Sequence, residues 1–71
     1  MGNQQRQLLA LRTIVVSGRA ALLKTPAADA REHTKVRILE LLAELEDTIN
    51  RDGANAEVLA RVDDARRDVW E

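Results

Sequence analysis

The sequence predicts an all-α fold in which an antiparallel helical hairpin carries a shorter third helix, a small three-helix bundle. Apolar residues recur at intervals of three and four, the spacing of one face of an α-helix. Phe and Tyr, which are typical of strands, are absent, and Trp70 is the only aromatic residue. Two short breaks, at Thr25-Pro26 and at residues 52–55, divide the chain into three segments. Because both breaks are short, neighbouring helices should be antiparallel.

The first helix is predicted over residues 3–23. Gly18 lies beside its main apolar stripe, and a glycine inside a helix costs about 1 kcal/mol relative to alanine. Either the glycine lets a second helix approach closely, or it marks a kink at Ser17-Gly18. We expect the close approach. The stripe consists of Leu8, Leu11, Val15 and Leu22.

The second helix is predicted over residues 26–51, and two residues compete to begin it. Thr25 is one candidate N-cap, with Pro26 at the first helical position, where its missing N–H costs nothing. Asp29 is the other, with Glu32 completing a capping box. Thr25 is slightly favoured because the alanines that follow are good helix formers. The central apolar stripe consists of Ile38, Leu42, Leu45 and Ile49, and Gly53 suits the end of the helix.

The third helix is predicted over residues 56–70, with Asn55 as its N-cap. Trp70, near its end, either closes the core or forms an exposed anchor for a partner, a role in which tryptophan is enriched. The apolar face consists of Val58, Leu59, Val62, Ala65 and Val69. Residues 1–71 are thus expected to form a single helical domain.

Composition argues against an enzyme. The chain has 71 residues and no cysteine, which excludes disulfides, thiol catalysis and cysteine-ligated metal centres, and it is too short for a nucleotide-binding fold. The only histidine, His33, falls on a polar arc of the second helix without ligand partners at helical spacing. We predict no catalytic residue, metal site or cofactor. The rest of the arc consists of Arg37, Glu40, Glu44, Asp47 and Arg51.

Charge is divided unevenly along the chain. Residues 1–28 carry four cations and no acid, and residues 29–71 carry seven cations and twelve acids, so the two parts are +4 and −5 and sum to −1. The first helix is expected to complement the acidic remainder of its own bundle, with Arg12 and Arg19 flanking a helix–helix seam. Nucleic-acid binding through this basic helix is the alternative function, although the overall charge argues against it. No segment reaches the length of a membrane span, and we expect a cytoplasmic protein.

The first helix carries more apolar surface than a three-helix monomer needs. Leu9, Val16 and Leu23 repeat every seven residues, about 100° around the helix from the main stripe, and Arg12 and Arg19 lie between the two sets. Exposed rows of this kind usually mark interaction sites. We therefore predict a non-enzymatic protein-binding module, an adaptor, chaperone or regulator, that forms a homodimer or binds another protein. The candidate interface residues are Leu9, Arg12, Val16, Arg19, Leu23 and Trp70.

Overall fold

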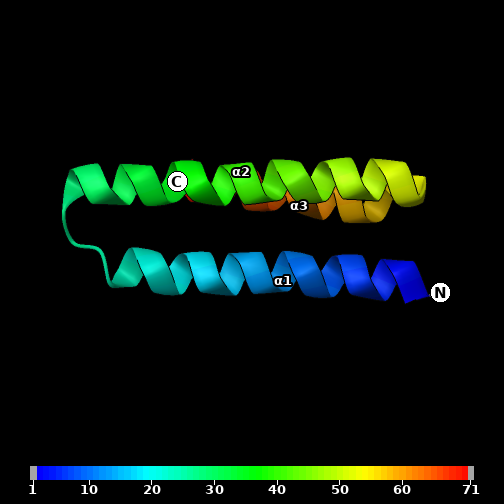
Figure 1. Cartoon of the computed structure of the whole chain (residues 1–71), viewed down its shortest axis with the longest axis horizontal. Coiled ribbons are helices and arrows are strands. Elements are labelled where there is room, and N and C mark those ends of the chain that lie inside the picture. The colour runs from blue at the N-terminus through cyan, green and yellow to red at the C-terminus, as the bar shows by residue number, and fades with distance from the viewer. Residues whose placement is uncertain (1, 71) are drawn as a thin grey trace.

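The computed structural model describes the backbone of residues 2–70 and the side chains of residues 4–69. Within that range the chain forms three α-helices and no strand: α1 (Gly2–Leu23), α2 (Ala28–Gly53) and α3 (Ala56–Trp70). α1 and α2 form an antiparallel hairpin, and α3 folds back along it parallel to α1 (Figure 1). Both long helices extend beyond the C-terminal end of α3. The predicted all-α class and packed three-helix arrangement are confirmed.

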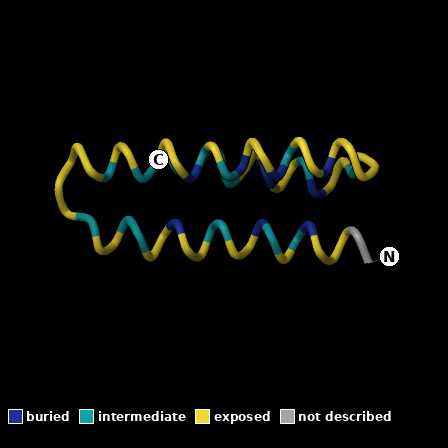
Figure 2. The backbone as a smooth tube through the Cα atoms, viewed as in Figure 1, coloured by how far each residue is buried: buried dark blue, intermediate teal, exposed yellow. Residues whose placement is uncertain are grey.

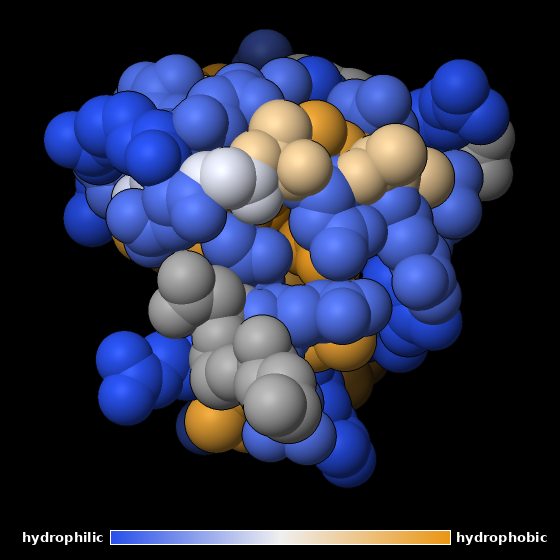
Figure 3. All heavy atoms as spheres, turned by 90° about the vertical axis from the view of Figure 1, so that its right-hand side faces the viewer, coloured by the Kyte–Doolittle hydropathy of each residue, from blue (hydrophilic) through white to orange (hydrophobic). Residues whose placement is uncertain are grey.

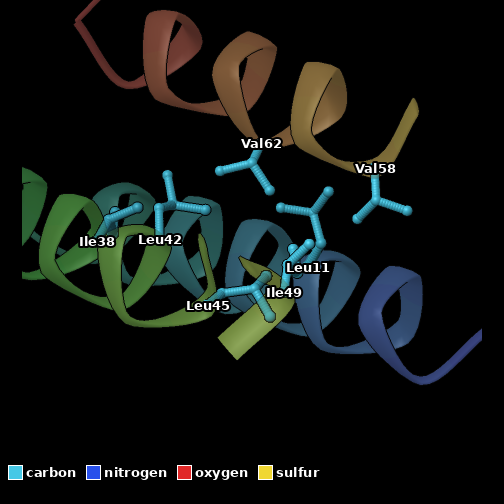
Figure 4. Packing of buried hydrophobic residues seen from close by; sticks show 7 residues of the cluster. All are labelled: Leu11, Ile38, Leu42, Leu45, Ile49, Val58 and Val62. Carbon is cyan, nitrogen blue, oxygen red and sulfur yellow. The ribbon is translucent and has the colours of Figure 1, made fainter. Parts of the chain in front are cut away.

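The core lies along the centre of the three helices. In Figure 2 the buried positions of each helix are on the sides that face the other two. Leu42 and Ile49 from α2 and Val58 and Val62 from α3 are fully buried. Each such side chain contributes roughly 1.5–3 kcal/mol through its removal from water. Figure 4 shows the whole cluster, which consists of Leu11, Ile38, Leu42, Leu45, Ile49, Val58 and Val62.

Gly18 allows α1 to approach α2 closely. α1 continues through Ser17-Gly18 as one helix, and Gly18 is buried. A Cβ built on Gly18 would lie 2.7 Å from Ile38 Cδ1 and 3.0 Å from Ile38 Cγ1, which is closer than such atoms normally come. Of the two interpretations of this glycine, the close approach is confirmed.

The start of α2 differs from both predicted caps. The N-cap is Ala27, which has no side chain able to cap, and the helix begins at Ala28. The Thr25 hydroxyl instead donates to the Ala21 carbonyl at 2.8 Å, within the last turn of α1. Arg31 reaches back from α2 and donates to the carbonyls of Leu22 and Thr25 at 2.5 and 3.3 Å. The Thr25 hydroxyl thus satisfies a carbonyl in the last turn of α1. Arg31 ties the start of α2 to the Leu22 carbonyl, which also accepts from the Thr25 backbone N–H at 3.2 Å, and to the Thr25 carbonyl in the connection.

The connection between α2 and α3 follows the predicted chemistry more closely. Gly53 ends α2 with a φ of 109°, a conformation that favours glycine. Asn55 caps α3, because its Oδ1 accepts hydrogen bonds from the backbone N–H groups of Glu57 and Val58 at 3.0 and 3.3 Å. Further along, Arg66 forms an ion pair with Glu46 that joins α3 to α2. Gly53 and Asn55 therefore end one helix and begin the next, and the Arg66–Glu46 pair adds a polar contact between α3 and α2 to the apolar core.

Candidate protein-binding surface

The polar arc of α2 is exposed to solvent. His33, Glu40, Glu44 and Asp47 are all exposed. Among the residues that the structure describes, no three His, Cys, Asp or Glu side chains are grouped so that they could hold a metal ion. A hollow of about 360 Å³ beside His33 is otherwise lined by Asp29, Glu32 and Val36. This arc is a solvated surface.

A larger groove, of about 560 Å³, runs between α1 and α3, and we call it the α1–α3 groove. It forms because α1 and α3 pack mainly on α2 and less on each other, and because Ala65 is small where α3 faces α1. Its walls and floor are apolar. The wall residues are Leu8, Val15 and Leu22 from α1 and Ala65 and Val69 from α3, and the floor residues are Leu11, Gly18, Ile38 and Leu42.

Charged side chains of opposite net sign border the α1–α3 groove. The α1 edge carries Arg12 and Arg19, whereas the α3 edge carries Arg61, Asp64 and Asp68, so the edges are +2 and −1. Arg19 and Asp68 approach to 3.9 Å across the mouth, with side chains 71% and 64% exposed. Ion pairs this exposed contribute little to stability, about 0–1 kcal/mol. The pair still shows that these two positions lie at the same level along the bundle.

The predicted second stripe of α1 is exposed. Leu9 is 65%, Val16 58% and Leu23 87% exposed, and we call these three residues the α1 row. Val16 also lines the α1–α3 groove, so the row and the groove form one continuous surface. Figure 3 views the bundle from the end where α1 begins, and hydrophobic atoms are visible there between the largely hydrophilic outer residues.

The sequence predicted the α1 side of this surface and only part of the α3 side. The row and the two arginines were identified from α1 alone, and Arg19 does meet an acid of the same chain, as expected. Ala65 and Val69 were predicted as part of the apolar face of α3, but Asp64 and Asp68, which border the groove at helical spacing, were not identified. Which side of α3 faces α1 depends on how the helix is rotated, and no local pattern encodes that. Trp70 was the remaining candidate, and its side chain lies outside the described residues.

No family model, curated protein or solved structure matches this chain in the comparisons made with each. The described helices also include none long and apolar enough to cross a lipid bilayer. A fold of this kind serves many unrelated functions, so function has to be argued from the surface itself.

Proposed function

We propose that this chain is a non-enzymatic protein-binding module whose binding face is the α1 row together with the α1–α3 groove. The observation that carries the proposal is the exposure of three large apolar side chains in a line, beside an apolar groove of about 560 Å³. Contiguous apolar surface with a charged border is typical of protein-interaction sites.

The shape of the face favours a helix as the bound element. Leu8 and Leu22 mark the two ends of the groove wall on α1, about 21 Å apart at 1.5 Å per residue. That length corresponds to about four turns of a bound helix. A helix packed there would contact α1 and α3 as the fourth member of a bundle, and helix-in-groove docking is a recurring mode of recognition.

Nucleic-acid binding through α1 has less support. Arg12 and Arg19 lie at the edge of the groove opposite Asp64 and Asp68. The remaining cations, Arg6 and Lys24, lie about 120–140° away around the helix at 100° per residue. The four cations therefore do not form one basic patch, and two of them face carboxylates that would repel phosphates.

Site-specific photo-crosslinking tests the proposal in the cells that express the protein. A benzophenone side chain at position 16, in place of Val16, should give a covalent adduct with a polypeptide. The same group at position 47, in place of the exposed Asp47 on α2, should give none. The adduct mass separates a second copy of the chain from a different protein.

A matched pair of arginine substitutions on α3 links the adduct to the groove. Ala65→Arg fills the α1–α3 groove and should abolish an adduct with a helix bound in the groove, whereas Ala60→Arg, on the exposed side of α3, should leave it unchanged. An adduct that survives both substitutions forms at the α1 row alone. Circular dichroism checks that both variants remain helical. Absence of an adduct at position 16, or an equal yield at position 47, would contradict the proposed function.

A further inference from the structure

We infer that the α1 row binds the α1 row of a second copy of this chain, about a two-fold axis that runs parallel to α1 and between the two copies. This inference rests on the proposed function, and it names the partner of the α1 row, with the α1–α3 groove left open. In this arrangement Leu9, Val16 and Leu23 of one copy lie opposite the same residues of the other.

The spacing of the row is the first argument. Its three residues repeat at seven-residue intervals, the period at which two parallel helices keep one seam in contact. All three are exposed, Leu23 most of all at 87%, so the seam is free along its full length in the isolated chain. When the α1 rows of two copies pack together, each apolar side chain contacts another apolar side chain, and no carboxylate is desolvated.

The charges beside the row are the second argument. Arg12 and Arg19 both lie on the side of the row that faces α3. A two-fold axis parallel to α1 places the arginines of the two copies on opposite sides of the seam. An axis perpendicular to α1 would make the helices antiparallel and bring all four arginines to the same side. Because like charges repel, the parallel arrangement is favoured.

The pairing of charge within one chain is the third argument, and it favours a second copy over an acidic foreign partner. Arg19 already faces Asp68 of its own α3, so this cation beside the row does not need an acid from another protein. The net charge of −1 also leaves little long-range repulsion between copies. Closed two-fold dimers are the commonest oligomers.

Sedimentation equilibrium on the purified chain gives the first test. Three row residues per copy make an interface smaller than the roughly 800 Å² per partner of a stable complex, so we expect a weak dimer with a Kd of about 100 µM. Val16→Arg places a charge in the seam and should weaken association at least tenfold. Val36→Arg is the matched control, since Val36 is also an exposed valine, 43% exposed, but lies on α2.

Single cysteines give the second test, and they distinguish the two arrangements, because the chain has no cysteine of its own. Parallel rows place residue 9 opposite residue 9, so Leu9→Cys alone should form a disulfide-linked dimer in a glutathione redox buffer. Antiparallel rows place residue 9 opposite residue 23, so only a mixture of Leu9→Cys and Leu23→Cys would cross-link. Asp47→Cys, on the exposed arc of α2, is the control for random collision.

A covalent Leu9→Cys dimer, together with a weakened Val16→Arg dimer, supports the inference. Cross-linking only in the mixture overturns the parallel arrangement. A wild-type chain that stays monomeric at about 1 mM overturns self-association altogether, ten times above the expected Kd. In that last case, the photo-adduct formed from position 16 decides whether the proposed function still holds. An adduct heavier than two copies of the chain would support the proposed function, with a different protein as the partner.

Discussion

Replacing Gly18 with alanine sets two effects of known size against each other. In an open helix the change would stabilise the protein by about 1 kcal/mol, because alanine is the better helix former. Here the new methyl group would lie 2.7 Å from Ile38 Cδ1 and 3.0 Å from Ile38 Cγ1. Ile38 is itself buried in the core, so it has little room to move.

The contact distances decide which effect prevails. Forcing an extra methyl group into a packed core costs typically 1–3 kcal/mol. Subtracting the gain in helix propensity leaves a net loss of roughly 1 kcal/mol in the free energy of unfolding for Gly18→Ala. Only one atom of Ile38 is closer than 3.0 Å, and it is the flexible end of the side chain, which argues against the upper limit of this range.

Ile38→Val removes that atom and makes the reasoning testable as a double-mutant cycle. Alone, Ile38→Val should cost about 0.5–1.5 kcal/mol for the lost methyl group. In the Ile38→Val background, Gly18→Ala should cost less than in the wild type, or stabilise. The expected coupling between the two positions is about 1 kcal/mol.

Urea denaturation followed by circular dichroism measures these free energies, at one protein concentration throughout because self-association adds to apparent stability. Ala20→Gly, at an exposed position of α1, gives the propensity effect alone and should cost about 1 kcal/mol. If Gly18→Ala stabilised the wild type by that amount, with no coupling to Ile38→Val, the close approach of α1 and α2 at Gly18 would be refuted.

Three further outcomes follow from the packing and the caps. Leu42→Ala should lower the free energy of unfolding by about 2–5 kcal/mol in urea denaturation, because Leu42 is fully buried. A decrease of less than about 1 kcal/mol would contradict the central place of Leu42 in the core. Asn55→Ala removes the acceptor for two N–H groups and should cost about 1 kcal/mol, whereas restoration by Asn55→Asp would identify capping as the cause. His33→Ala and Glu44→Ala should change stability by less than about 0.5 kcal/mol, and a melting temperature that rises with added divalent metal would show that this arc is not simply solvated.

Periodicity predicted the three helices because each one buries a continuous stripe. All seven buried apolar core residues belong to the stripes read from the sequence. The exposure of Leu9, Val16 and Leu23 was predictable for the same reason, since a helix at the edge of a three-helix bundle buries one side only. Gly18 was interpretable because a costly residue inside a helix implies a compensating contact.

The start of α2 was not predictable from local signals. Thr25 and Asp29 are both good N-cap residues, yet neither caps the helix. The Thr25 hydroxyl bonds backwards into α1, and Arg31 bonds to a carbonyl nine residues before it. The competition between these bonds is decided by how α1 and α2 meet, which is a tertiary property.

The binding face was half predictable for a related reason. Its α1 side follows from one helix, and Ala65 follows from the apolar face of α3, whereas the acidic border formed by Asp64 and Asp68 depends on the rotation of α3 about its own axis. At that rotation Arg66 of α3 meets Glu46 of α2, a residue twenty positions earlier in the chain. Pairs at such separation carry no signature in a single sequence.

The short length of α3 has a consequence for how the molecule opens. Beyond the end of α3, the last turn of α1 and the first turns of α2 pack mainly against each other in the described part of the chain. Amide hydrogens in this part should therefore exchange with solvent through local opening, at a lower free energy than amides around Leu42 and Ile49, which exchange only on global unfolding. The two hydrogen bonds from Arg31 close this end of the hairpin. Leu23 lies there, so one end of the α1 row sits on the part of the bundle that opens most readily.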